Sequence, residues 1–597
     1  MEYLAKLSEA NLNGKLSSSA ASNLELWLSE PRYSIYCERI RAMIDAGEWD
    51  KLNDAFYQII PFGTGGRRGP VGVGPNRMNE ITIAESAQGL ANKVKKAVHG
   101  RRPKVVVAHD TRLTATEFTL KTACVLAGNE IDVYLFDGAR ATPELSFMIR
   151  HLGCDAGIVI SASHNPPEDN GFKAYWNDGG QVVPPLDGEL IEEVQNAQEV
   201  REIPYEEACA RGFIHRLGPA DDDCYFNAVL AQSLISDRSA RIVYSPLHGA
   251  GKYSVYPVLL KAGFKDIHLV ESQKDPDGRF PFVPDHKPNP EITSGLNAAI
   301  ALGRAVKADL VIASDPDADR LACAVPSESG PDYFVLTGNQ CAALLMEFIC
   351  ARMAETGKLK SSHRIYTTCV SSPLMPTIAR SYGLTVKDDL LVGFKWIAEQ
   401  IKLLTDANDF LFGSEESIGF MKGPYTRDKD AAAAALLVGE LASYLKSQGK
   451  TVLGMLDDIY RKYGYFSDAG TSIFLEGAKG SQRMKNIMEK LRKNPPREIG
   501  GQPILAIVDR ANGEIRNVQG NKLGSVEGPL SNLLFFRLRE DNKSWIAIRP
   551  SGTEPKIKFY FSLYHEVSGN IEENKKDLDE LAAKLMKSMT EVAMAVD

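Results

Sequence analysis

The sequence predicts an α/β fold: three similar α/β units with mixed or parallel sheets, followed by a smaller C-terminal α+β unit. Apolar runs of strand length alternate with helical segments from about residue 104 to residue 412, which is typical of parallel sheets covered by helices. In each of the three units, a polar loop follows the end of a core strand. Beyond about residue 465 this alternation ends, so a different kind of unit is expected there.

The elements follow from hydrophobic spacing. Residues 1–50 carry apolar side chains at roughly helical spacing, so they are expected to form a helical extension. In the three α/β units we expect strands at 104–108, 131–136, 157–160, 241–244, 267–270, 310–313, 365–368 and 410–412, and helices at 119–126 and 143–152. In the last unit we expect strands at 472–475, 504–508, 533–538, 545–548 and 558–563, and a helix at 571–594. The expected units are 1–50, 51–220, 221–335, 336–465 and 466–597.

Composition and charge argue against several classes of function. The chain is 44% hydrophobic and 24% charged, as globular proteins are, and its net charge of −8 gives no global attraction for nucleic acid. Nine scattered cysteines without a Cys-x-x-Cys pair favour reduced thiols in a cytoplasmic protein and give no zinc signature. Without a signal-peptide pattern or an apolar run of 18 residues, no membrane partner is expected.

The stretch 161–175, Ser-Ala-Ser-His-Asn-Pro-Pro-Glu-Asp-Asn-Gly-Phe-Lys-Ala-Tyr, follows the apolar run 157–160. Ligands bind at the ends of strands in open α/β sheets. A serine hydroxyl is a weak nucleophile at neutral pH and needs a base or a cation beside it. We interpret the stretch as a loop that offers Ser163 the partners His164 and Lys173. An ordinary strand-to-turn connection is the alternative.

Asp315, Asp317 and Asp319 follow the expected strand 310–313. In an extended loop, carboxylates at every second position point the same way and could hold a hard divalent cation. Without a cation, or without Arg320 as partner, their mutual repulsion is unfavourable. An EF-hand is excluded because it needs Gly and Glu where this loop has Arg320 and Pro326. Mg²⁺ fits better, and a solvated acidic turn is the alternative.

Two stretches carry groups that suit a phosphorylated sugar. Glu415 and Ser417 follow the expected strand 410–412 and suit hydrogen bonds to sugar hydroxyls, although a turn or a helix N-terminus would use the same residue types. The stretch 549–553 offers the guanidinium of Arg549, two hydroxyls and accessible N–H groups. It is therefore a candidate pocket for a phosphate that is not transferred.

Other stretches offer cations. The glycine-rich stretch 62–69 includes Arg68 and can bring N–H groups and positive charge to a phosphate, unless it is a flexible surface loop. The stretches 393–395 and 427–430 add Lys395 and Lys429, whose alternative is solvated surface charge.

In this order, the stretches together resemble the α-D-phosphohexomutase superfamily of phosphoglucomutases and phosphomannomutases, from about residue 62 to residue 564. Ser-Pro-Leu-His-Gly at 245, Lys-Asp-Pro-Asp at 274, Gly-Phe-Lys-Trp at 393 and Asp-Lys-Asp at 428 resemble one branch most. That branch contains phosphoglucomutase-2, phosphopentomutase and glucose-1,6-bisphosphate synthase. The resemblance implies four units around a deep central cleft.

The resemblance also implies roles for single residues. Ser163 would carry the phosphoryl group, with His164, Lys173 and Arg68 beside it and Lys173 as the first choice for acid–base help. Asp315, Asp317 and Asp319, with a phosphoserine oxygen of Ser163, would bind Mg²⁺. The implied substrate-binding residues are Arg320, Lys395, Glu415, Ser417, Lys429, Arg549, Ser551, Gly552 and Thr553. The sequence departs from the family at Ser161, Ser414 and Arg67, where Thr, Gly and an apolar residue are usual, and the last two are expected near the sugar or the phosphate.

The implied activity is that of a phosphosugar mutase, an intramolecular phosphotransferase that interconverts a sugar 1-phosphate and 6-phosphate, with glucose as the first choice. The implied route passes through a phosphoserine enzyme, with glucose 1,6-bisphosphate as intermediate and activator. A bisphosphate synthase, a phosphopentomutase or a phosphomannomutase are alternatives. A non-catalytic sensor is disfavoured by the intact Ser163, aspartates and Arg549 stretch. The expected partners are sugar phosphates, and the expected state is a monomer or a small homo-oligomer.

Overall fold

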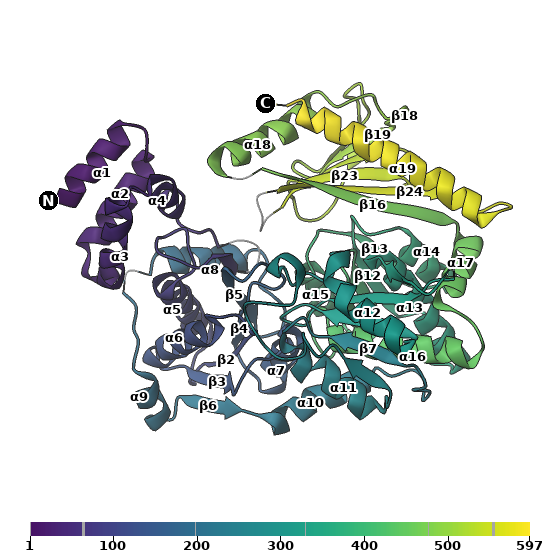
Figure 1. The fold of residues 1–597 in the computed structure, drawn as a ribbon, viewed down its shortest axis with the longest axis horizontal. Coiled ribbons are helices and arrows are strands. Elements are labelled where there is room, and N and C mark those ends of the chain that lie inside the picture. The colour runs from purple at the N-terminus through teal and green to yellow at the C-terminus, as the bar shows by residue number, and fades with distance from the viewer. Residues whose placement is uncertain are drawn as a thin grey trace.

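The structure is a computed structural model that describes residues 2–62, 66–197, 199–328, 330–475, 477–551 and 556–596. Figure 1 shows N-terminal helices, three mixed α/β units and a C-terminal antiparallel sheet under two helices. This architecture confirms the predicted fold class. None of the helices in these ranges combines the length and the apolar character that a membrane crossing requires.

The N-terminal extension has its own small core. Trp27 stacks on Tyr33, with ring centroids 4.4 Å apart, and packs edge-on against Phe56. The extension also touches the first unit, because Val73 belongs to the same apolar cluster. Its helices are α1 (Glu2–Leu12), α2 (Ser18–Ser29), α3 (Ser34–Asp45) and α4 (Trp49–Phe56).

The first sheet has the strand order β1-β5-β4-β2-β3-β6. Its centre is parallel, but β5 runs antiparallel to both β4 and β1. The strands are β1 (Gly66–Pro70), β2 (Lys104–His109), β3 (Asp132–Phe136), β4 (Ala156–Ile160), β5 (Asp169–Trp176) and β6 (Ile214–Leu217). The helices are α5 (Glu80–Ala97), α6 (Ala115–Gly128), α7 (Thr142–His151), α8 (Leu186–Gln195) and α9 (Tyr205–Ala210).

The second and third sheets have the orders β11-β10-β9-β7-β8 and β13-β12-β14-β15. The second contains β7 (Ile242–Ser245), β8 (Ile267–Leu269), β9 (Leu310–Ser314), β10 (Leu321–Pro326) and β11 (Tyr333–Leu336), with α10 (Pro219–Leu230), α11 (Val255–Ala262) and α12 (Asn297–Val306). The third contains β12 (Arg364–Thr368), β13 (Thr385–Leu390), β14 (Phe410–Glu415) and β15 (Gly419–Lys422), with α13 (Gly338–Glu355), α14 (Leu374–Ser381), α15 (Lys395–Lys402), α16 (Ala431–Ser447) and α17 (Val452–Tyr463).

The C-terminal sheet has the order β16-β24-β23-β22-β19-β20-β21, and every neighbouring pair is antiparallel. Its strands are β16 (Tyr465–Phe474), β19 (Ala506–Asp509), β20 (Glu514–Arg516), β21 (Lys522–Ser525), β22 (Leu534–Arg537), β23 (Trp545–Pro550) and β24 (Lys556–His565). The helices α18 (Gly477–Lys493) and α19 (Ile571–Met594) cover one face, and the third unit lies on the other side (Figure 1). Residues 498–503 form a separate short pair of strands, β17 (Glu498–Ile499) and β18 (Gln502–Pro503).

Helix α16 is the central element of the larger core. Its first half is a run of alanines, the best helix formers, and Asp430 caps it by accepting from the N–H of Ala432 at 2.7 Å. Because alanine is small, the helix packs closely against α11, β15 and β9. One continuous apolar cluster runs through the second, third and C-terminal units, whereas the first sheet has clusters of its own.

Every strand expected from an apolar run overlaps an observed strand, and the expected helices lie within α6, α7 and α19 or shifted by one residue. The pattern did not indicate β1, β5, β6, β10, β11, β13, β15, β17, β18, β20 or β21. Several of these are short, half-polar or rich in glycine, so their apolar periodicity is weak. The important omission is β5, because it carries Lys173.

Lys422, at the end of β15, allows the free-energy cost of burying a charged side chain to be measured. It is 7% exposed, and within the described part of the chain its ammonium has one hydrogen bond, to Gln232 Oε1 at 3.3 Å. Burial lowers the pKa of Lys422 to about 8. A lysine whose pKa falls on folding destabilises the folded state below that pKa, and the cost disappears as the pH rises through the unfolded value of about 10.4.

We therefore expect Lys422→Met to stabilise the protein by about 2–3 kcal/mol at pH 7, and by less than half of that near pH 9.5, from the linkage of about 1.4 kcal/mol per pKa unit. Chemical denaturation at the two pH values measures both numbers. Lys450→Met, at a solvent-exposed lysine, is the control and should give no such difference between them. A destabilised Lys422→Met variant at pH 7 would contradict the argument.

Candidate active site

The loop after β4 holds Ser163 in a strained conformation. All five residues of β4 are buried, so the chain leaves the sheet with Ser161 still inside the protein. The Ser161 hydroxyl donates to Asp110 Oδ2 at 2.7 Å and accepts from the Ser163 N–H at 2.8 Å. Ser163 has a φ of 54°, in the left-handed region that a residue with a Cβ rarely adopts. In this conformation its hydroxyl donates to the carboxylate of Asp315.

Arg112 binds the backbone of this loop. It is 3% exposed, and its guanidinium donates to four carbonyl oxygens of the loop. The acceptors are Ser163 O at 2.6 Å, Asn165 O at 2.5 Å, Pro166 O at 2.6 Å and Asp169 O at 2.8 Å. Four charge-assisted bonds from one planar group fix the loop backbone as a unit. Arg112 is thus the principal support of the Ser163 conformation.

Lys173 comes from a strand and not from a loop, which corrects the prediction. It lies on β5, where it pairs with Val159 of β4 on one side and with Gly66 of β1 on the other. A central position between two strands makes its backbone rigid. The neighbouring Gly171 permits this close approach, since a Cβ there would be 2.5 Å from Ser161 O. Lys173 is therefore presented from a fixed scaffold.

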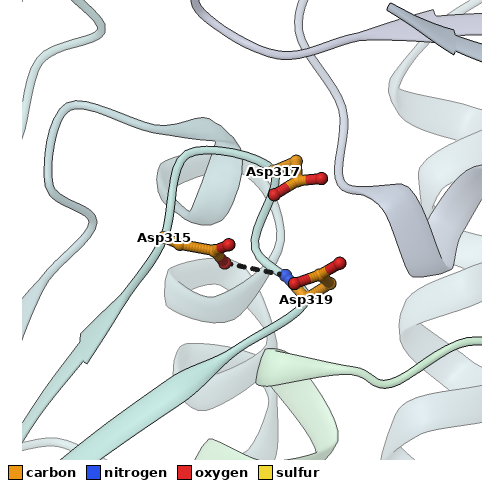
Figure 2. A group of neighbouring side chains, drawn as sticks. All are labelled: Asp315, Asp317 and Asp319. Carbon is orange, nitrogen blue, oxygen red and sulfur yellow. Dashed lines mark hydrogen bonds between the residues drawn. The ribbon is translucent and has the colours of Figure 1, made fainter. Parts of the chain in front are cut away.

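The three aspartates gather on the loop after β9. Figure 2 shows them projecting from successive parts of one tight turn, with the Asp319 N–H donating to the carboxylate of Asp315. One ligand atom of each lies within 4.8 Å of the others, and all three residues are buried. The loop is not simply extended as predicted, because Ala318 adopts a left-handed φ of 51°. The predicted convergence of the carboxylates nevertheless occurs.

This loop is the meeting point of three units. The Ser163 hydroxyl donates to Asp315 Oδ2 at 2.8 Å, and Lys173 Nζ lies 2.5 Å from Asp317 Oδ2. Lys429, which precedes α16, lies 2.7 Å from Asp319 Oδ2. Burial opposes ionisation of Asp317, but the ammonium of Lys173 holds its pKa below the ordinary value. Burial, and next the charge of Asp319, raise the pKa of Asp315.

The donor set fits a hard divalent cation. Oδ1 of Asp317 and Oδ1 of Asp319 are buried and accept no hydrogen bond from the described residues. Buried carboxylate oxygens without donors are costly unless a cation satisfies them. An all-oxygen set of this kind suits Mg²⁺.

The second unit supports the aspartate loop by close packing. The stretch 245–251 lies under it, and the Ala250 N–H donates to Pro316 O at 2.8 Å. A Cβ on Gly249 would lie 2.4 Å from Pro316 Cα, so only glycine fits there. This explains the glycine in the Ser-Pro-Leu-His-Gly stretch.

His164 and Arg68 lie beside Ser163, as predicted. His164 Nδ1 is 3.2 Å from Ser163 Oγ, and Arg68 Nη1 donates to Ala162 O at 3.2 Å. Arg68 lies on β1, so the end of the glycine-rich stretch is a strand. Burial, followed by the positive charges of Arg320 and Arg68, lowers the pKa of His164 well below its ordinary value. The imidazole beside the serine is therefore neutral at physiological pH.

The third unit contributes Glu415 at the end of β14. Its Oε1 accepts from the Gly393 N–H at 3.0 Å, and burial raises its pKa to about 7. Arg320 lies 3.3 Å from Glu291, and Ser417 is half-buried in the turn after β14. Glu415 and Ser417 therefore both belong to the third unit. The turn after Glu415 contacts the second unit, because the Ile418 carbonyl accepts from the N–H of Leu321, which follows the aspartate loop.

The C-terminal unit contributes Arg549 at the end of β23. The positive charge of Arg549 favours the ionised form of Glu416, the neighbour of Glu415. The C-terminal sheet therefore contributes to the electrostatic potential of the site. The Ser551 N–H donates to Lys556 O at 2.8 Å. Gly552 and Thr553 lie outside the residues that the structure describes.

Two residues lie elsewhere than expected. Lys395 Nζ is 3.8 Å from Asp187 on α8, and within the described ranges no hydrogen bond or ion pair joins it to the aspartates or Glu415. Arg67 turns its buried side chain into α5, where it donates to Thr82 O at 2.9 Å. Alternation along β1 explains this, since neighbours on a strand face opposite ways. Arg67 is thus not near a sugar or a phosphate, which corrects the expectation.

Sequence reasoning missed several residues of the site. Arg112 follows the strand 104–108, and Thr142 donates to Asp317 Oδ2 at 2.9 Å from the start of α7. Glu291 pairs with Arg320, and Lys558 on β24 acts electrostatically on both Glu291 and Glu416. Arg112 lies just after the end of β2, a signal that could have singled it out, whereas Thr142 opens α7, six residues after β3. Lys558 sits inside an apolar strand and gave no comparable signal.

Comparison with known proteins agrees with this geometry. Three domain models match, described as Phosphoglucomutase/phosphomannomutase, alpha/beta/alpha domains I, II and III, at residues 60–201, 223–328 and 337–463. A phosphoglucomutase of Staphylococcus aureus is 36% identical over 550 residues, which are 91% of this chain and 96% of that protein. A phosphoglucomutase of Staphylococcus epidermidis is 35% identical over 520 residues, 86% of this chain and 92% of that protein.

Solved structures share the fold. The Paramecium phosphoglucomutase pp63/parafusin, in its open form, has a TM-score of 0.63 at 17% identity and is matched over 90% of this chain and 95% of its own. A phosphoglucomutase/phosphomannomutase family protein of Burkholderia thailandensis has a TM-score of 0.61 at 18% identity, over 89% of this chain and 97% of its own.

The Arg112 clamp yields a prediction. Arg112→Met leaves four loop carbonyls without their donor, so we expect backbone hydrogen exchange in 161–169 to rise at least tenfold. Leaving these carbonyls without a donor, and the buried Asp110 without its cation, costs about 3–5 kcal/mol. Hydrogen-exchange mass spectrometry measures the loop directly. Arg102→Met, which removes a half-exposed arginine paired with Asp132, is the control and should cost less than about 1 kcal/mol. Equal behaviour of the two variants would refute the clamp.

Proposed function

We propose that this chain, which belongs to the phosphoglucomutase/phosphomannomutase family, interconverts glucose 1-phosphate and glucose 6-phosphate through a phosphorylated Ser163. As a member of that family it is an intramolecular phosphotransferase. The observation that carries the assignment is the meeting of a strained serine hydroxyl, 2.8 Å from Asp315, with a buried carboxylate cluster and Lys173. A nucleophile, an acidic metal-binding cluster and a cation at one point suit phosphoryl transfer.

In the proposed reaction, phospho-Ser163 gives its phosphoryl group to the free hydroxyl of a sugar monophosphate. The resulting glucose 1,6-bisphosphate turns in the site, and its other phosphoryl group returns to Ser163. Mg²⁺, held by Asp315, Asp317, Asp319 and the phosphoserine, would supply positive charge to the transferring group. Lys173 is placed to exchange the proton of the reacting hydroxyl, because its Nζ lies at the aspartate cluster and its strand is rigid.

The remaining residues orient the sugar. Glu415 carries a pKa of about 7, so its carboxyl can either accept or donate a hydrogen bond to a sugar hydroxyl, and Ser417 adds a second such group. Arg320 and Lys429 contribute positive charge beside the aspartates. The Arg549 stretch, with Ser551, Gly552 and Thr553, would grip the phosphate that is not reacting. Lys395 lies on the third unit, with its Nζ 3.8 Å from Asp187 of the first unit.

Phosphorus NMR tests the activity. Glucose 1-phosphate, mannose 1-phosphate and ribose 1-phosphate are each given to the protein with Mg²⁺ and a trace of glucose 1,6-bisphosphate. We expect glucose 1-phosphate to be converted fastest to its 6-phosphate, with the bisphosphate staying at trace level. Accumulation of bisphosphate from a second donor, or faster conversion of another sugar, would overturn the proposal.

Ser163→Ala is expected to lower turnover at least 10⁴-fold, because no other hydroxyl can replace a covalent carrier. Its thermal unfolding should stay close to that of the native protein, since the loop remains bound by Arg112. Transfer of radiolabelled phosphate from glucose 1,6-bisphosphate to the protein measures the carrier directly. Ser447→Ala, on the exposed end of α16, is the control and should label fully. Normal labelling of Ser163→Ala would reject this serine as nucleophile.

Removal of Mg²⁺ provides a separate test. Excess EDTA should stop turnover, and added Mg²⁺ should restore it. A readout without activity is thermal stability, because an ion that binds only the folded protein raises the melting temperature. We expect Mg²⁺ to stabilise the native protein and to lose most of that effect in Asp317→Asn. If Mg²⁺ stabilises both proteins equally, the cluster is not its site.

A further inference from the structure

A cavity of about 580 Å³ lies between the third unit and the C-terminal sheet. That volume is within the range of about 300–1,000 Å³ that is usual for small-molecule sites. Its walls come from α14 and β13 on one side and from β19 to β23 on the other. Among the described residues, none that we place in the catalytic site lines it.

The cavity is distinct from the site of the Arg549 stretch, although both use the same strand. Trp545, at the start of β23, lines the cavity, and Arg549 follows four residues later. Residues four apart on a strand share a face and lie about 13 Å apart. The cavity therefore opens on the same face of the C-terminal sheet as Arg549, two side-chain repeats away.

Two arginines in this wall lack an acidic partner. Arg510 is 5% exposed and donates only to main-chain carbonyls, to Asp389 O at 2.8 Å and Glu527 O at 3.5 Å. Its buried Nε has no hydrogen-bond partner among the described residues. Arg537 on β22 is half-buried, and in the described ranges no ion pair or side-chain hydrogen bond engages it. Burial and the charge of Arg510 lower the pKa of Arg537, so the two guanidinium groups repel.

The acidic residues of the wall divide into two kinds. Asp388 is paired with Arg380 at 2.7 Å, and Asp541 is paired with Arg539 at 3.0 Å. Asp389 and Glu527 have no ion pair among the described residues. Among the described residues, the wall thus offers three cations without an ion pair, Arg510, Arg537 and the half-buried Lys543, and two exposed carboxylates without one, Asp389 and Glu527.

This combination selects a class of ligand. A bare anion would be repelled by the carboxylates, and a cation would be repelled by the arginines. A sugar phosphate satisfies both, because its phosphate accepts from guanidinium groups and its hydroxyls donate to carboxylates. The rings of Phe535 and Trp545, 5.6 Å apart at the edge of the cavity, offer an apolar surface for the sugar.

We propose that this cavity is a second, non-catalytic binding site for a phosphorylated sugar, with the phosphate held by Arg510 and Arg537 and the hydroxyls by Asp389 and Glu527. A ligand there touches both the third unit and the C-terminal unit. It therefore joins the unit that carries Glu415 to the unit that carries Arg549.

Hydrogen-exchange mass spectrometry with glucose 6-phosphate as the probe tests the proposal. We expect protection of peptides covering 506–516 and 534–546 in the native protein, with a half-saturating concentration at least tenfold lower than for inorganic phosphate. In Arg510→Gln/Arg537→Gln that concentration should rise at least tenfold. Arg537→Gln alone, at a half-buried residue, keeps the test valid if the double variant does not fold.

Two controls separate this site from the catalytic one. Arg497→Gln changes an exposed arginine of the C-terminal unit that does not line the cavity, and it should leave the protection unchanged. Arg549→Gln removes the arginine to which we assign the non-reacting phosphate in the catalytic site. Glucose 6-phosphate should nevertheless still protect the peptides 506–516 and 534–546 in this variant. If their protection disappears with Arg549, or if neither arginine of the cavity matters, the second site does not exist. Equal affinity for inorganic phosphate would overturn the assignment of a sugar.

Discussion

The burial of three carboxylates on one loop is the constraint on which the rest of the structure depends. Asp315, Asp317 and Asp319 are at most 2% exposed. In a medium of low polarity, such a cluster is unfavourable unless positive charge lies against it. The side chains that supply this charge come from separate units, Lys173 from β5 and Lys429 from the segment before α16. Assembly of the units and formation of the site are therefore one event.

The segment 428–430 contributes both to charge compensation at the aspartates and to the contacts between units. Asp428 accepts from the Tyr175 hydroxyl of β5 at 2.8 Å, and Lys429 pairs with Asp319. Asp430 caps α16, the helix that fills the large core. Three consecutive residues thus tie the first, second and third units to one another. A change in the angle between any two of these three units would strain or break one of these contacts.

The sequence predicted the fold and the positions of most candidate site residues because both depend on local signals. Apolar runs identify strands, and in α/β units the polar residues after them lie at one edge of the sheet. Ser163, the aspartates and Glu415 stand in such positions. Lys173 was singled out as a residue, but its strand was not recognised, because 169–176 mixes polar, glycine and aromatic residues.

What the sequence could not supply is pairing across the chain. Arg112 contacts residues more than 50 positions away, and its role appears only when β2 and β4 lie side by side. Lys558 is similar, because a lysine within an apolar strand has no pattern that marks it as electrostatically active. Arg67 is a residue that the sequence placed at the site and the structure does not. Its neighbour Arg68 faces the site, and neighbouring side chains on a strand point to opposite faces.

The C-terminal unit meets the third unit through two kinds of surface. The large apolar cluster that runs through the second and third units continues into the C-terminal unit, and a second, small cluster that includes Val370, Val508 and Phe535 adds to it, with the polar cavity beside it. A continuous apolar core of this kind disfavours displacement of one unit against the other, because displacement would expose it to water. A bisphosphate that turns in the site requires its distal phosphate to be released and gripped again. The large apolar cluster joins the unit that carries Arg549 to the units that carry Glu415 and the aspartates, whereas Ser163 and Lys173 stand on the first sheet, which has apolar clusters of its own.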